Sequence, residues 1–162
     1  MIKQKSCKDL PVVSNPCAPY GAWGLDSCVL VCRHDRTERM ERFQNAFKTA
    51  LSVVDWSYDG TILIAGSITG EVLAWEFATR TLVLANRHAH SYAPISGLSW
   101  APGGRHLVAI TMARTIQIWN VATRTCMVLP CQGDTEEIVW ELDGSGFRTN
   151  DGVVWTEPEG GR

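Results

Sequence analysis

The segment Leu-Ser-Val-Val-Asp-Trp-Ser-Tyr-Asp-Gly at residues 51–60 occurs again, in altered form, as Ile-Ser-Gly-Leu-Ser-Trp-Ala-Pro-Gly-Gly at residues 95–104. A second pair keeps the same offset: Ala-Trp-Glu-Phe-Ala-Thr-Arg-Thr at 74–81 and Ile-Trp-Asn-Val-Ala-Thr-Arg-Thr at 118–125. Trp56 and Trp100 are 44 positions apart, as are Trp75 and Trp119. An offset that holds across aromatic, turn and polar segments means that one supersecondary unit is repeated whole.

Each unit reads as four short strands. The first is predicted to contain strands at residues 51–56, 62–65, 71–77 and 81–85, and the second at 95–100, 106–110, 115–119 and 125–129. Asp59-Gly60 and Gly103-Gly104 are tight turns of the kind that join hairpin strands. Four antiparallel strands in a unit of this length make one blade of a β-propeller, so we predict an all-β fold.

Two further segments resemble the unit less closely. Trp23, Asp26 and the apolar run after it parallel Trp56, Asp59 and the strand that follows, and Ile138 to Trp140 with Asp143-Gly144 begins a shortened copy. Residues 35–50 fit either a strand or a helix. We therefore expect an extended segment at 1–19, blades at 20–48 (degenerate), 49–86, 93–131 and 135–158 (truncated), and a tail at 159–162.

These motifs resemble the WD-repeat family: Trp-Ser-x-Asp-Gly or Trp-Ala-Pro-Gly-Gly, an apolar strand, and then a strand ending in Trp. The tryptophans at the repeat positions are expected to be structural: Trp23, Trp56, Trp75, Trp100, Trp119 and Trp140. The family often links a His, a Ser, an Asp and this Trp by hydrogen bonds. We expect that network to be broken, since Ala65 and Ala109 stand at the Ser positions, Thr69 and Ala113 at the Asp positions, and only Asp35 is retained.

The resemblance implies a non-catalytic scaffold or adaptor that holds a protein or peptide partner on its loops. The residues that it places there are Arg36, Ile68, Arg87, His88, Tyr92, Met112 and Arg114. Tyr, Met and Arg are residue types that anchor interfaces.

The number of blades leaves two architectures open. Two full and two partial units give three to four blades, whereas propellers close with four to eight. The chain is either a minimal four-bladed ring, with residues 10–13 adding the outer strand of the last blade, or an arc. We favour the arc, which would be a fragment, a relic, or one half of a homo-oligomer that completes the propeller.

Composition limits the partners and the chemistry. A net charge of -2 gives no general attraction to nucleic acid or to an anionic membrane, so we expect neither partner. No apolar run is long enough to span a bilayer, and residues 1–10 lack the apolar centre of a signal peptide. The expected compartment is the cytoplasm, with the nucleus as the alternative.

No metal, cofactor or catalytic site is expected. Cys28, Cys32 and His34 lack the Cys-x2-Cys spacing of zinc sites, and the histidines, His106 among them, have no nucleophile motif nearby. Arginines recur at positions 33, 36, 39 and 42, but Asp35, Glu38 and Glu41 interleave with them, which predicts a solvated, self-paired surface. Two further hypotheses are a small-ligand-binding or enzymatic propeller that uses its central channel, and a truncated relic without independent function.

Overall fold

The computed structural model describes residues 12–43, 47–86 and 92–158, and these residues form β-strands and no helix. The strands build four antiparallel meanders, called sheets A to D in chain order. Sheet A contains β1 (Val13–Ser14), β2 (Tyr20–Leu25), β3 (Cys28–Arg33) and β4 (Arg36–Phe43); sheet B contains β5 (Leu51–Trp56), β6 (Ile62–Ser67), β7 (Val72–Glu76) and β8 (Leu82–Asn86). Sheet C contains β9 (Ile95–Trp100), β10 (His106–Thr111), β11 (Thr115–Asn120) and β12 (Thr125–Pro130); sheet D contains β13 (Ile138–Trp140), β14 (Gly146–Thr149) and β15 (Val154–Thr156).

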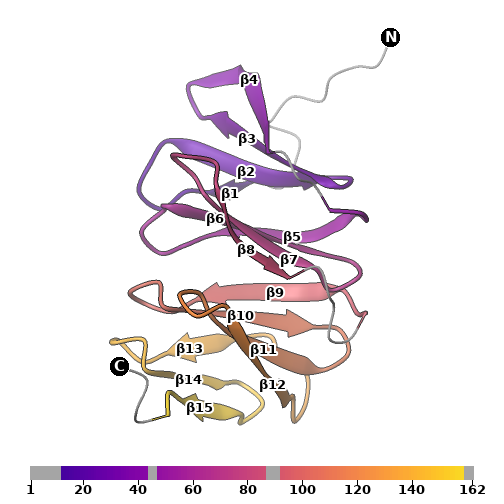
Figure 1. The fold of residues 1–162 in the computed structure, drawn as a ribbon, viewed down its shortest axis with the longest axis vertical. Helices are drawn as coiled ribbons and strands as arrows, with labels where there is room; N and C mark the ends of the chain where they lie inside the picture. Colours follow the sequence, from indigo (N-terminus) through magenta and orange to yellow (C-terminus); the bar gives the residue numbers. More distant parts are fainter. Residues whose placement is uncertain (1–11, 44–46, 87–91, 159–162) are drawn as a thin grey trace.

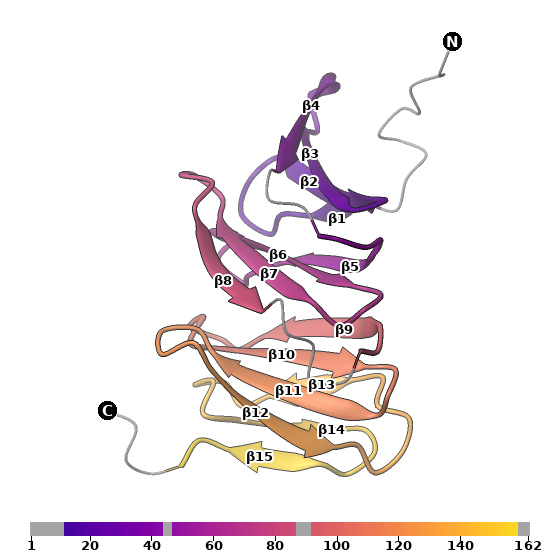
Figure 2. The same cartoon turned by 45° about the vertical axis from the view of Figure 1, so that its right-hand side comes forward.

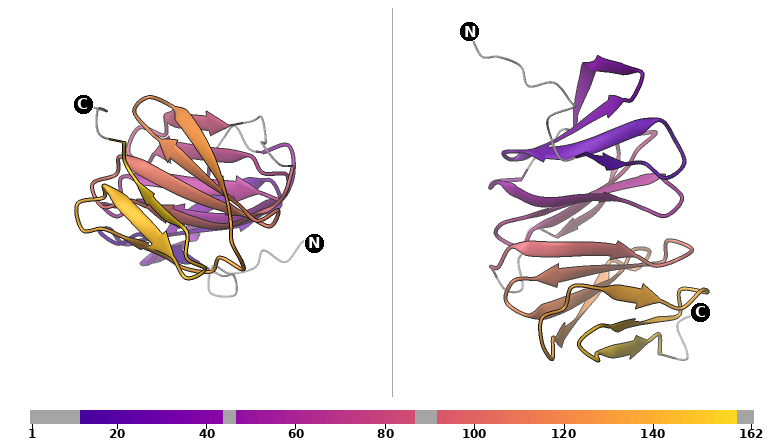
Figure 3. Two further views of the ribbon diagram at one scale, coloured as in Figure 1. Left: turned by 90° about the horizontal axis from the view of Figure 1, so that it is seen from below. Right: turned by 180° about the vertical axis from the view of Figure 1, so that it is seen from behind.

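The four sheets lie face to face in chain order (Figure 1). Separate clusters of buried apolar side chains fill the spaces between sheets A and B, B and C, and C and D. Sheets A and D occupy opposite ends of the stack in Figure 2 and in the right-hand view of Figure 3. The described residues therefore form a partial propeller, as the arc predicts, and they do not close the minimal four-bladed ring.

In each of sheets B, C and D, three aromatic or apolar side chains form a row across the strands at the equivalent position. Leu63 on β6 lies between Trp56 and Trp75, and Leu107 on β10 lies between Trp100 and Trp119. Sheet D repeats the row as Trp140, Phe147 and Trp155. The strands of sheets B and C are thus paired in the same register at their tryptophans, which is why the 44-residue offset is constant in the sequence.

Sheet A has a different register from the one that its sequence resemblance predicts. Trp23 does not end a first strand as Trp56 does; it lies on the second strand of its sheet, opposite Leu30. Gly24 on β2 faces Leu51 just as Gly66 on β6 faces Ile95, which makes β2 the equivalent of β6. A Trp followed by Asp and an apolar strand fits both positions, so the local pattern could not separate them.

Two other expectations about sheet A are corrected or decided by the structure. Residues 36–43 form strand β4 rather than a helix, because Phe43 and Met40 are needed on opposite faces of the sheet, Phe43 toward sheet B and Met40 beside Trp23. The segment expected to complete the last blade lies in part outside the described residues, and Val13 instead pairs with Ala22 inside sheet A.

Candidate functional site

The turns between the second and third strands of all four sheets lie along one edge of the stack, which we call the loop edge. Backbone hydrogen bonds tie these turns to the start of a first strand: Leu51 N donates to Asp26 O (2.7 Å), Ile68 N to Ala50 O (3.0 Å) and Met112 N to Pro94 O (2.9 Å). The same antiparallel geometry gives sheet D the equivalent turn between β14 and β15. The loop edge faces right in Figure 1.

Large apolar side chains are exposed along the loop edge. Ile68 is 45% exposed, Met112 is 70% exposed and Tyr92, just before β9, is 85% exposed. The structure thus brings together three of the residues predicted to bind a partner. Leu25, 44% exposed at the end of β2, belongs with them and was missed because the register of sheet A was misassigned.

The remaining predicted residues divide into three groups. Arg114 lies on the loop edge, in the turn between β10 and β11. Arg87 and His88 lie outside the described residues. Arg36 is at the opposite edge, in the hairpin between β3 and β4, because β2 and not β3 is the second strand of sheet A. For the same reason Asp35, expected in the loop-edge turn of its blade, instead forms a two-bond ion pair with Arg33 (2.9 and 3.0 Å).

Arg114 has an unusual backbone conformation for its residue type. Its φ is 57°, in the left-handed region, whereas the equivalent turn position is Gly70 (φ 86°) in sheet B and Gly152 (φ 92°) in sheet D. A side chain in this region costs about 1–2 kcal/mol, which glycine avoids. Arg80 (φ 60°) and Arg124 (φ 58°) share this conformation in the turns before β8 and β12, so what sets Arg114 apart is that glycine holds its position in sheets B and D.

A hollow of about 330 Å³ opens on the loop edge between sheets C and D. Met112 and Arg114 line one side, and the connection that contains Asp134 and Glu136 lines the other. Arg114 pairs with Asp134 across it at 3.0 Å. Both side chains are more than two-thirds exposed, so the pair adds little to stability and either group is accessible to a partner.

The turn of sheet D is held by a carboxylate. Asp151 accepts hydrogen bonds from the Thr149 and Thr135 hydroxyls and from the backbone N–H groups of Gln132 and Gly133. These hydrogen bonds, of which the one from the Thr149 hydroxyl has the largest effect, lower the pKa of Asp151 to about 2. Asp151 therefore stays ionised at neutral pH and fixes one wall of the hollow.

Sheets B and C use hydroxyl groups at the same turn, and these contacts include neither the histidine nor the tryptophan of the family's network. The residues that bind the turn are Ser67 and Thr111, two positions after Ala65 and Ala109. Thr69 occupies the Asp position of sheet B and contacts the hydroxyls of Ser67 (3.1 Å) and Thr49 (2.9 Å). The turn is thus held by hydroxyl groups without the aspartate, whereas the buried Trp75 Nε1 has no hydrogen-bond partner among the described residues, as expected for a broken network.

Two other features are absent from the part of the chain that the structure describes. No group of three or more His, Cys, Asp or Glu side chains there could hold a metal ion. Those residues also contain no helix able to cross a membrane. His106 is buried at the opposite edge, where its Nε2 lies 3.6 Å from Glu157 Oε1 and its ring contacts Trp155 edge to face.

Comparison with known proteins yields a likeness of fold. No family model matches the chain, and no curated protein matches it. A solved structure described as "Crystal Structure of Mitotic Checkpoint Complex" contains a chain with 23% sequence identity and a TM-score of 0.68. The alignment covers 90% of the present chain and 45% of that chain, so the present chain spans about half its length.

Proposed function

We propose that the chain is a non-catalytic, WD-repeat-like interaction module that binds a protein or peptide through its loop edge. The observation that carries this proposal is the exposure of Leu25, Ile68, Tyr92 and Met112 on one edge, from three successive sheets. Apolar side chains grouped on a surface favour a binding site, and Tyr and Met are residue types enriched in interfaces. The similar chain belongs to a structure described as a complex, which agrees with such a role.

The polar groups of the hollow would give this surface its selectivity. Arg114 and Asp134 neutralise each other in the free chain, and a partner that contacts either one has to replace that pairing. Exposed charges at the border of an apolar patch mainly set which partners are accepted and how fast they bind. This role would account for an arginine at a turn position that glycine occupies in sheets B and D.

The proposal is tested with peptides selected from a random phage-displayed library against the immobilised chain. Each selected peptide is titrated against the wild type, against Tyr92→Ser/Met112→Ser, and against the control Tyr58→Ser/Leu142→Ser. Tyr58 and Leu142 are 76% and 98% exposed, but they lie in first turns at the opposite edge, so the control removes comparable apolar surface elsewhere. We expect the loop-edge variant alone to lose about 10-fold or more in affinity, since truncating an anchor residue costs about 2 kcal/mol. Equal binding to both variants would remove the loop edge from consideration.

A second copy of the chain is the other partner that we propose, at the sheet D end of the stack. The outer face of sheet D presents Val139 and Val154 on either side of Arg148, and Val154 is 69% exposed. A stack that spans about half of a longer chain leaves room for a second stack. Light scattering over a concentration series should give a dimer that Val154→Lys weakens. A monomer at every concentration would refute this contact and leave the loop edge untouched.

A further inference from the structure

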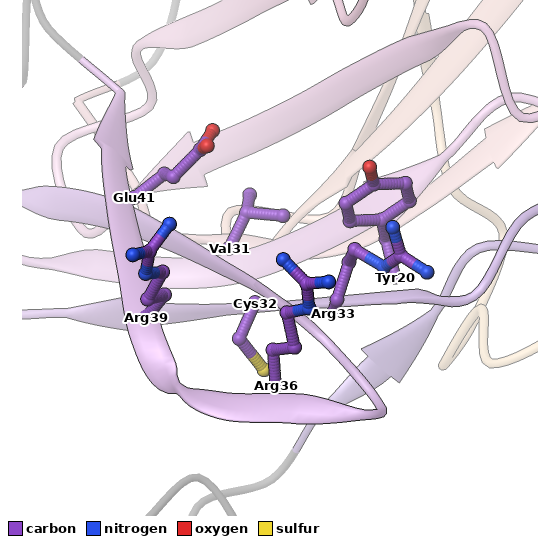
Figure 4. Close-up of a pocket in the computed structure, with 7 residues that line it drawn as sticks. All are labelled: Tyr20, Val31, Cys32, Arg33, Arg36, Arg39 and Glu41. Carbon is purple, nitrogen blue, oxygen red and sulfur yellow. The ribbon is translucent and has the colours of Figure 1, made fainter.

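A small hollow in sheet A collects three arginines. Its volume is about 150 Å³, and its lining combines buried Val31 and Cys32 with Arg33, Arg36 and Arg39. Tyr20 and Glu41 complete the lining. Figure 4 shows Arg36 and Arg39 extending from β4 and Arg33 and Tyr20 from the neighbouring strands. The hollow lies away from the loop edge, at the β3–β4 hairpin.

The pairing of β3 with β4 places like charges together. Arg33 is the direct cross-strand partner of Arg36, although like charges opposite each other destabilise a sheet. The register then jumps, so that Cys32 pairs with Met40 and three residues of β4 are left out of the ladder. Bulges of this kind often redirect side chains beside functional sites.

The charges in the hollow are only partly neutralised. Asp35 neutralises Arg33, and Arg80 reaches Glu41 from sheet B. Among the side chains that the structure describes, neither Arg36 nor Arg39 has an ion pair or hydrogen bond. The sequence predicts a self-paired arginine surface, whereas among the described side chains two guanidinium groups have no acidic partner, in a chain whose net charge is -2.

We infer that this hollow binds a phosphate monoester carried by a side chain of a protein partner. A phosphorylated side chain carries about -1.5 to -2 charges, which matches the two available arginines. Guanidinium groups bind phosphate oxygens through paired hydrogen bonds, and the Tyr20 hydroxyl is a further donor at the border. A volume of about 150 Å³ holds one phosphoryl group and is too small for a nucleotide. The negative net charge disfavours a polyanion such as nucleic acid or an anionic membrane.

The experiment measures fluorescence anisotropy of a labelled Ala/Gly peptide with one central phosphoserine, at low salt. Two control peptides, with serine or glutamate in place of the phosphoserine, are measured in parallel. Vesicles that contain about 20–30% phosphatidylserine and a single-stranded oligonucleotide are measured as well. The test variant is Arg36→Gln/Arg39→Gln. Its control is Arg42→Gln/Arg124→Gln, which removes the same charge from exposed positions outside the hollow. Thermal unfolding confirms that both variants fold.

We expect the phosphoserine peptide to bind the wild type, and its affinity to fall about 10- to 100-fold in the test variant, because each charge-assisted hydrogen bond contributes about 1.5–3 kcal/mol. The control variant should stay within about twofold, since exposed rim charges contribute little. Equal affinity for the serine or glutamate peptide would overturn the assignment to phosphate. Tighter binding to vesicles or to the oligonucleotide would overturn the assignment to a protein side chain.

This inference stands apart from the proposed function of the loop edge. The variant Tyr92→Ser/Met112→Ser should retain phosphoserine binding, because Tyr92 lies just before β9 and Met112 in the β10–β11 turn, and neither lines the arginine hollow. Loss of phosphopeptide binding in that variant would overturn the location of the phosphate site.

Discussion

Replacement of Gly66 by alanine should disrupt the contact between sheets B and C. A Cβ at position 66 would lie 2.6 Å from Ile95 Cβ and 2.8 and 2.9 Å from its two γ-carbons. These atoms are close to the backbone of a buried, β-branched residue and cannot rotate away, so the sheets have to separate. Overpacking of this kind costs about 1–3 kcal/mol, against a gain of about 0.5–1 kcal/mol from replacing a strand glycine.

Gly97→Ala is the matched control. A Cβ at Gly97 would meet Ile110 Cδ1 at 3.5 Å, an ordinary contact, so this substitution should be neutral or stabilise by up to about 1 kcal/mol. Urea unfolding followed by tryptophan fluorescence should show a midpoint about 0.5–1 M lower for Gly66→Ala and no decrease for Gly97→Ala. Ile95→Ala should relieve the clash, so the double variant with Gly66→Ala should be more stable than additivity predicts, by about 1 kcal/mol. A Gly66→Ala protein as stable as Gly97→Ala would refute the close packing of sheets B and C at this point.

Three more outcomes follow from the described side chains. Burial lowers the pKa of His106, so the unfolded chain takes up a proton there at higher pH than the folded chain does, and the free energy of unfolding should fall as pH drops below about 6.5. His106→Ile should reduce this pH dependence, measured by urea unfolding at several pH values. The same pH dependence in the variant would contradict the prediction. Hydrogen bonds, chiefly the one from the Thr149 hydroxyl, hold the pKa of Asp151 at about 2, so the contribution of Asp151 to the free energy of unfolding is present above about pH 4 and lost toward pH 2. Asp151→Asn should lower the free energy of unfolding by about 1–3 kcal/mol at pH 7 and reduce this acid dependence. A variant as stable as the wild type at pH 7 would disprove the prediction. Arg114→Gly and Arg124→Gly (φ 57° and 58°) should each stabilise by about 1 kcal/mol, but only Arg114→Gly should weaken binding of the loop-edge peptides; equal effects on binding would deny Arg114 a special role.

The strands of sheets B and C could be predicted almost residue by residue, because the repeated unit carries its turns and its tryptophans together. Strand β5 and strand β9 have the predicted ends, and the others differ by one or two residues. Sheet A could not be predicted in the same way. Its β4 has local helix preference, and its pairing with β3 decides the outcome. Strand β14 was not predicted, since Gly146–Thr149 has too little apolar character.

The candidate site could be predicted in part. Ile68, Met112, Tyr92 and Arg114 were chosen by resemblance, and the structure places them on one edge, although their role in binding remains a prediction. Arg36 was placed by the wrong register. The availability of Arg36 and Arg39 depends on which acidic side chains reach them, and Glu41 pairs with Arg80 from the next sheet, a contact that sequence spacing does not reveal.

The stack of sheets also sets the order in which the protein opens. Sheets B and C each pack on both faces, whereas sheets A and D each pack on one neighbouring sheet among the described residues, and sheet D is the smaller of the two because it has three strands instead of four. In an array of this kind each unit depends on its neighbours, so cooperativity weakens toward an end that has only one neighbour. Backbone amides of β13 and β14 should therefore exchange with deuterium sooner than those of β6 and β10. The chain then unfolds as a graded series of subglobal openings that begins at its carboxyl-terminal hairpins, well before the central pair of sheets separates.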